Sequence, residues 1–151
     1  MKFNNNMNLM YVLKNKNKII SKVKCGNSFY DRFKGLMFKK EVDFGFLIKI
    51  PKNRLKNPKN RLKTSKNTLN HSNMNTFFKR FPSSIHSFFM LVAIDIVFLD
   101  DNFNVVDLKT LYPWRFYIPK AVSFYVIELK LGTIKKYEIA IGNKLKLIKI
   151  N

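Results

Sequence analysis

Short runs in which hydrophobic residues cluster or alternate with polar ones dominate this sequence. Each run covers about five to seven residues, a length and period typical of β-strands and too short for most helices. A polar turn at residues 101–104 joins two neighbouring runs into a hairpin. The predicted strands cover residues 7–13, 18–24, 44–50, 86–92, 94–100, 105–111, 123–129 and 144–150.

Two further segments favour short helices. Residues 26–38 place apolar side chains on one helical face, and Asn27 or Ser28 can cap the start of that helix. Thr133 can cap a single turn within residues 133–139. Many short strands with one or two short helices predict a mainly β fold, a compact antiparallel sandwich or barrel-like domain. The apolar residues of the first helical face are Phe29, Phe33, Leu36 and Met37.

Residues 51–71 differ in pattern from the rest of the chain. They form three seven-residue units, PKNRLKN, PKNRLKT and SKNTLNH, with one Leu in each. A coiled coil needs two apolar positions per unit, and Pro51 and Pro58 interrupt a continuous helix. We therefore expect residues 1–151 to form a single domain in which residues 52–79 are a basic, mobile insertion loop. An RNA-contacting basic arm is the alternative for this segment.

The formal net charge of +20 has two explanations. A basic surface attracts polyanions, because Lys and Arg that neutralise phosphates release counterions. However, only five of the 29 basic residues are Arg, and Asn and Ile are abundant beside Lys, as AT-rich codons would produce. We favour the compositional explanation and keep weak, non-specific nucleic-acid binding as an alternative.

The sequence also gives information on the cellular location of the protein. No apolar run approaches the roughly 18 residues of a membrane span, and the N-terminal residues lack the apolar core and cleavage site of a signal peptide. Cys25 is the sole cysteine, so an intrachain disulfide cannot form. These features predict a cytoplasmic protein with no membrane partner.

The most unusual polar residue is Asp95, which interrupts the most hydrophobic segment of the chain. In a strand over residues 94–100, Asp95 would share one face with Val97 and Leu99, while Ile94, Ile96 and Phe98 would occupy the other. Both faces are apolar, which indicates a central strand covered on both sides. A buried carboxylate costs several kcal/mol unless it is paired or hydrogen-bonded, so Asp95 must have a partner.

Several residues are candidates for a polar cluster with Asp95. His86, Arg115 and Arg32 are possible cations, and Trp114, beside Arg115, could form the wall of a pocket. Glu128 is a second carboxylate in an apolar strand. The predicted ligand-binding candidates are Arg32, His86, Asp95, Trp114, Arg115 and Glu128.

The ordered segments RFKGLMF (32–38), GFLIKIP (45–51), SIHSFFM (84–90), IDIVFLD (94–100), VVDLKTLYPWR (105–115), YVIELKLGTI (125–134) and IGNKL (141–145) resemble the family known as domain of unknown function 192. The resemblance covers most of the chain except the insertion, and implies a compact mainly β domain with no established activity. The residues that match motif positions of the family are Arg32, Gly35, Leu36, Met37, Met90, Asp95, Phe98, Asp100, Pro113, Glu128 and Gly132.

A branch of the family also shares Ser84, His86, Trp114 and Arg115. The sequence departs from the family pattern at three positions. Phe89 stands where many relatives have Trp, Phe46 stands where Met is usual, and Asn143 replaces the Asp of a Gly-Asp pair. The last change removes a negative charge that a cation site there would need.

These observations leave several functions open. A structural polar network around Asp95 and a small-ligand-binding module both explain the candidates, and the partner would then be a small molecule. A hydrolase-type enzyme using His86 and Asp95 is less favoured, because the chain lacks a nucleophile motif such as G-x-S-x-G. We predict no catalytic residue, metal or cofactor, since zinc needs three or four ligands and His71, His86 and Cys25 are the only His and Cys residues.

Overall fold

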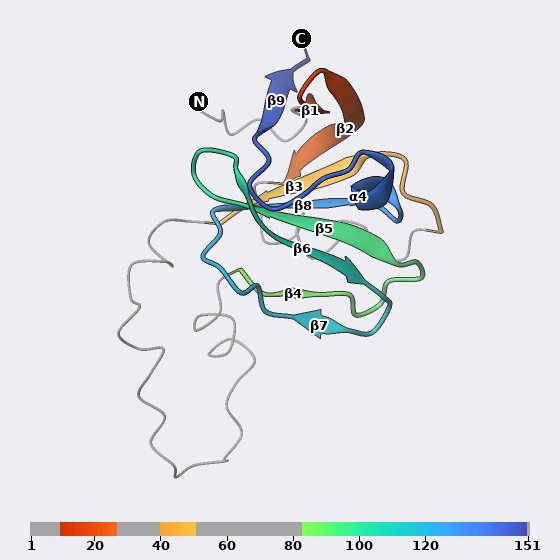
Figure 1. The fold of residues 1–151 in the computed structure, drawn as a ribbon. Helices are drawn as coiled ribbons and strands as arrows, with labels where there is room; N and C mark the ends of the chain where they lie inside the picture. Colours follow the sequence, from red (N-terminus) through yellow and green to blue (C-terminus); the bar gives the residue numbers. More distant parts are fainter. Residues whose placement is uncertain (1–9, 27–39, 51–82, 151) are drawn as a thin grey trace, which may run out of the picture.

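One seven-stranded sheet forms most of the structure, a computed structural model that describes residues 10–26, 40–50 and 83–150 (Figure 1). The strand order is β6-β5-β8-β3-β2-β1-β9. All neighbours are antiparallel except β2 and β3, so the sheet is mixed. The strands are β1 (Met10–Asn15), β2 (Lys18–Gly26), β3 (Gly45–Lys49), β5 (Ile94–Leu99), β6 (Val105–Leu111), β8 (Tyr125–Lys130) and β9 (Leu145–Lys149).

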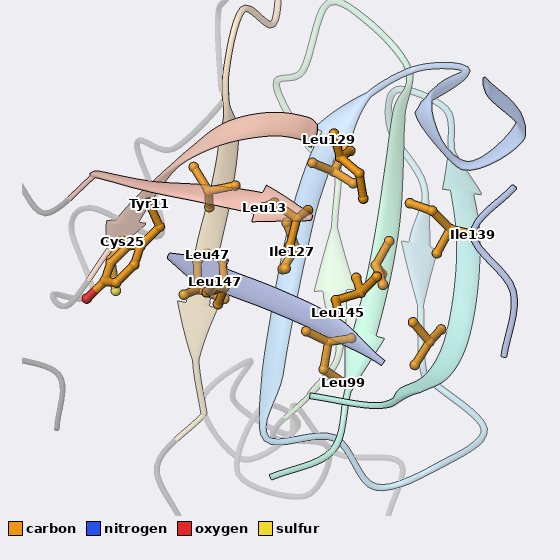
Figure 2. Close-up of a cluster of buried hydrophobic side chains, with 14 residues drawn as sticks. Tyr11, Leu13, Cys25, Leu47, Leu99, Ile127, Leu129, Ile139, Leu145 and Leu147 are labelled. Carbon is orange, nitrogen blue, oxygen red and sulfur yellow. The ribbon is translucent and has the colours of Figure 1, made fainter. Parts of the chain in front are cut away.

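The sheet curls around a first hydrophobic core, to which Tyr11, Leu13, Leu47, Ile127 and Leu129 contribute side chains from three strands, β1, β3 and β8 (Figure 2). The short helix α4 (Thr133–Lys136) is followed by Ile139, which joins the same core. Curling brings the segment before β9 close to β6, where the Val105 N–H donates to the Asn143 carbonyl at 2.8 Å. Strands β6 and β9 themselves do not pair, so the sheet stays open and is not a barrel.

A second, smaller layer covers the other face of the sheet. It consists of strands β4 (Ile85–His86) and β7 (Phe116–Tyr117) with their adjoining loops, residues 83–92 and 112–120, and is called the β4–β7 layer below (Figure 1). The second core lies between this layer and the sheet. Met90 from the layer belongs to it, and the Tyr117 ring lies 5.7 Å from the ring of Phe98 in β5.

Asp107 in β6 fixes the β4–β7 layer to the edge of the sheet. Its carboxylate accepts hydrogen bonds from the Tyr117 hydroxyl at 2.9 Å and from the Lys120 backbone N–H at 2.8 Å. Burial, and then the hydrogen bond to Asp107, raise the pKa of Tyr117 to about 12. The phenol is therefore protonated at neutral pH and can donate to Asp107.

The predicted mainly β class is confirmed, and each long strand of the main sheet falls within or close to a predicted run. The strand predicted over residues 86–92 is wrong. Only Ile85–His86 is strand, because the chain turns at residues 88–89 and Phe89 has a left-handed φ of 62°. Strand β7 was not predicted. The helix predicted in residues 26–38 and the insertion loop at 52–79 lie outside the described residues.

Gly45 provides a test of the packing between the strands. A Cβ atom at this position would lie 2.8 Å from Leu129 Cδ2, 3.1 Å from Val23 Cγ2 and 3.2 Å from the Glu128 carbonyl oxygen. Because Val23 and Leu129 are fully buried, they have little room to move. We expect Gly45→Ala to lower the free energy of unfolding by about 1–3 kcal/mol, measured by urea denaturation. Ser21→Ala on the neighbouring strand is the control, and an unchanged urea midpoint for Gly45→Ala would contradict the packing described here.

Candidate functional site

Asp95 is almost completely buried, with 1% of its surface exposed, and both of its carboxylate oxygens accept a hydrogen bond. Thr110 Oγ1 in β6 donates to Oδ1 at 2.7 Å, and the backbone N–H of Ile134 in α4 donates to Oδ2 at 2.9 Å. The first turn of a helix has backbone N–H groups without intrahelical partners, and a carboxylate satisfies one of them well. Asp95 therefore ties α4 and β6 to the central strand β5.

The expectation that His86 or Arg115 holds Asp95 is wrong. Asp95 lies directly opposite Leu129 of β8 and Thr110 of β6, and residues directly opposite on paired strands share a face. That face belongs to the first core, whereas His86 and Arg115 belong to the layer on the other side of the sheet. His86 and Asp95 consequently form no catalytic dyad. Arg32 lies outside the described residues.

Glu128 occupies the face opposite to that of Asp95. It pairs with Phe46 of β3 on one side and with Ile96 of β5 on the other, both of which belong to the second core. Its side chain is 8% exposed, and burial raises its pKa to about 7. Within residues 10–26, 40–50 and 83–150, no group donates a hydrogen bond to this carboxyl. Asp95 and Glu128 are therefore two separate buried carboxyl groups, one of which is hydrogen-bonded.

The remaining candidates, His86, Trp114 and Arg115, lie together in the β4–β7 layer. The half-buried imidazole of His86 stacks on Phe88 with ring centroids 5.0 Å apart, and burial lowers its pKa. The Phe88 ring lies 6.3 Å from Trp114, and Trp114 meets Phe89 edge-on at 5.0 Å. These four rings form a continuous group, called the aromatic cluster below: His86, Phe88, Phe89 and Trp114.

The fully buried Ser87 holds the two loops that carry the aromatic cluster. Its hydroxyl donates to the Tyr112 carbonyl and accepts from the Arg115 N–H at 2.9 Å, so it bridges the two ends of the turn at residues 112–115. Its carbonyl accepts from the Trp114 N–H at 3.0 Å. One small polar residue thus connects the Phe88–Phe89 turn to the Trp114 turn through side-chain and backbone hydrogen bonds.

Phe89 and Trp114 share two unusual properties. Both have left-handed backbone conformations, with φ of 62° and 60°, which bulky residues rarely adopt. Both residues are also exposed, Phe89 to 44% and Trp114 to 59%. Strained backbone that supports exposed aromatic rings is more characteristic of a functional surface than of a stabilising one.

The sequence patterns did not identify Ser87, Phe88 or Phe89 as site residues. The apolar run around them resembles a strand, and neither Phe nor Trp signals a left-handed φ. One signal was present at Pro113, because Pro at the second position of a turn often precedes a residue with positive φ. Here that residue is Trp114.

Neither a metal site nor a membrane span is found in the described part of the chain. Among its residues, no three His, Cys, Asp or Glu side chains gather where they could hold a metal ion. None of its helices has the length and apolarity needed to cross a membrane.

The structure thus defines a small mainly β domain with an open mixed sheet, a hydrogen-bonded buried carboxylate and an exposed aromatic cluster. Residues 65–147 match the model of the DUF192 family, described as "Uncharacterized ACR". The chain is 35% identical over 137 residues to a UPF0127 protein of Thermococcus sibiricus, covering 90% of this chain and 73% of that one. This chain belongs to the DUF192 (UPF0127) family.

Other relatives match a shorter part. A UPF0127 protein of Pyrococcus horikoshii is 52% identical over 67 residues, which cover 44% of this chain and 58% of the relative. Two crystal structures share the fold. A Sinorhizobium meliloti protein proposed to be a transcription regulator has a TM-score of 0.63 at 15% identity, covering 92% of both chains. A Novosphingobium aromaticivorans protein of unknown function has a TM-score of 0.59 at 14% identity, covering 91% of this chain and 83% of the other.

Asp95→Asn tests the structural role of the buried carboxylate. The amide oxygen of Asn can accept one of the two hydrogen bonds, but its NH₂ group would face the other donor. We expect the free energy of unfolding to fall by about 1–3 kcal/mol, because one buried donor loses its acceptor. Urea denaturation measures this change, with the exposed Asp101→Asn as control. Wild-type stability for Asp95→Asn would show that the two hydrogen bonds contribute nothing net.

Glu128→Gln tests the burial of the second carboxyl. Because its pKa is raised from 4.5 to about 7, the folded protein binds this proton more tightly than the unfolded chain does. The resulting stability is present below pH 4.5 and is lost as the pH rises to about 7. The loss amounts to about 3 kcal/mol at pH 8. We expect Glu128→Gln to remove this pH dependence in melts between pH 5 and pH 8.

The matched control for this experiment is Glu138→Gln, because Glu138 is exposed. It should retain the wild-type pH dependence. Identical pH dependence in wild type and Glu128→Gln would contradict the assignment to Glu128.

Proposed function

We propose that this protein is a non-catalytic binding module whose ligand contacts the aromatic cluster. The observation that carries the proposal is the pair of exposed rings, Phe89 and Trp114, held on left-handed backbone around the buried Ser87. An exposed aromatic ring offers a flat apolar surface, and Arg115 directly after Trp114 adds a cation. The ligand therefore combines a planar aromatic group with a negative charge.

In this proposal, some of the candidate residues stabilise the fold and others contact the ligand. Asp95 is hydrogen-bonded within the first core and has a structural role. His86, Trp114 and Arg115 belong to the binding surface. Glu128 lies on the sheet face beneath the β4–β7 layer and contributes to the pH dependence of stability rather than to ligand contact.

The aromatic cluster supports binding better than catalysis. Residues 83–94 and 108–122, which include the layer, contain no Asp or Glu to act as a general acid or base. Asp107 at the edge of the layer is engaged by the Tyr117 hydroxyl and the Lys120 N–H, and Glu128 is buried beneath the layer. The one imidazole, His86, has a lowered pKa and stacks on a ring. We also propose a cytoplasmic location, supported by the single cysteine, Cys25, which is buried.

Trp114→Ala tests this function with 8-anilinonaphthalene-1-sulfonate, a planar aromatic anion, as the probe. Trp114 is the only tryptophan of the chain, so energy transfer from tryptophan to the probe has a single donor, and the cluster variants locate the bound probe. We expect saturable transfer in the wild type. Loss of one stacking ring costs about 1–3 kcal/mol of binding free energy. The affinity of Phe89→Ala for the probe, measured by energy transfer, should therefore be about 10-fold lower than that of the wild type.

Trp114→Ala lacks the tryptophan donor, so its binding is measured by total probe fluorescence. Its affinity for the probe should also fall about 10-fold, and its melting temperature should not change. Ile19→Ala is the matched control, because Ile19 in β2 is also 59% exposed but lies outside the β4–β7 layer. Absence of energy transfer in the wild type, or wild-type affinity in both cluster variants, would refute the proposed function.

A further inference from the structure

We infer that the ligand of the aromatic cluster is single-stranded nucleic acid, whose bases stack on Trp114 and Phe89 while Arg115 and neighbouring lysines contact phosphates. This inference rests on the proposed function and names its ligand. It differs from generic attraction to a basic protein, because it assigns the contact to one small part of the surface.

The openness of the aromatic cluster favours a strand over a small molecule. Small-molecule sites enclose about 70–90% of the ligand surface in a concave pocket. Trp114 and Phe89 are instead 59% and 44% exposed, so a ligand on them remains open to solvent on its far side. Proteins that bind single strands use this arrangement, because each base stacks weakly on one ring and the contacts add along the strand.

The charges of the same region fit a polyanion. Arg115 follows Trp114, Lys120 ends the β4–β7 layer, and the Lys109 ammonium lies 5.4 Å from the centre of the Tyr117 ring. Residues 83–94 and 108–122 contain no Asp or Glu, and the neighbouring Asp107, whose carboxylate accepts hydrogen bonds from Tyr117 and Lys120, is only 5% exposed. Arg can bind a phosphate through two parallel N–H groups, which suits it to a backbone contact beside a stacked base.

The geometry also favours a single strand over a duplex as the ligand. In a duplex the bases are stacked on one another and unavailable to a protein ring, so a duplex offers this surface only its phosphates. An unpaired base exposes its face. Because every base has such a face, binding should show little sequence preference, and it should weaken as salt rises.

The test uses the full chain and an oligothymidylate of about 12 nucleotides, within the range of strand lengths that small domains bind. Quenching of Trp114 fluorescence reports stacking, and the anisotropy of a labelled strand reports affinity. We expect saturable quenching by the single strand. Trp114→Ala and Phe89→Ala should each weaken binding about 10-fold, whereas Ile19→Ala should not change it.

Two charge variants separate a local contact from the overall charge. Arg115→Gln and Lys146→Gln each remove one positive charge, but Lys146 is an exposed residue of β9, in the main sheet rather than the β4–β7 layer. Arg115→Gln should weaken binding and reduce the slope of log affinity against log salt by about 0.7. Lys146→Gln should leave both within error of the wild type.

Three results would overturn the inference. The first is an equal loss of affinity in Arg115→Gln and Lys146→Gln, or an affinity for inorganic polyphosphate equal to that for the oligothymidylate. Either result would mean that the protein attracts any polyanion. The second is tighter binding of a duplex of the same length. The third is tighter binding, with stronger Trp114 quenching, by phosphatidylserine vesicles or a Glu-rich peptide. If the sulfonate probe binds beside Trp114 but the oligonucleotide does not, the inference fails while the proposed function stands.

Discussion

The constraint on which this structure depends is the burial of strand β5 and its neighbour β8 on both faces. All six residues of β5 are buried, and so are four of the six in β8. Side chains of a strand alternate between faces, so each face receives its own core: the curled sheet encloses one, and the β4–β7 layer covers the other. A polar side chain in either strand then has no route to bulk water and must be satisfied locally or remain desolvated.

The two carboxyl groups of these strands meet that constraint differently. Asp95 is hydrogen-bonded from two directions, by a hydroxyl on β6 and by the first turn of α4, so its polarity connects three elements. Glu128 has apolar neighbours on both adjacent strands, and its raised pKa follows from burial. The same strand pairing thus produces one residue that stabilises the fold and one whose ionisation opposes it.

Much of the fold was predictable from the sequence, because most strands of the sheet are short runs whose pattern is local. The burial of Asp95 was predictable for the same reason. Its partners were not, since the donors lie 15 and 39 residues away and one is a backbone N–H that carries no side-chain signal. The strand predicted at residues 86–92 failed because hydrophobicity does not report backbone conformation, and Phe89 adopts a left-handed φ there.

The site residues divide along the same line. His86, Trp114 and Arg115 were chosen as candidates by residue type and stay predictions, but their grouping with Asp95 was wrong because the sheet lies between them. What brings the aromatic cluster together is Ser87, an unremarkable residue in sequence that satisfies both ends of the turn at residues 112–115. Rings on a turn fixed in this way lose little conformational freedom when a ligand binds, so even a shallow surface can bind measurably. The net charge of +20 belongs to the whole sequence and does not account for two strained, exposed residues beside Arg115 in a segment without carboxylates.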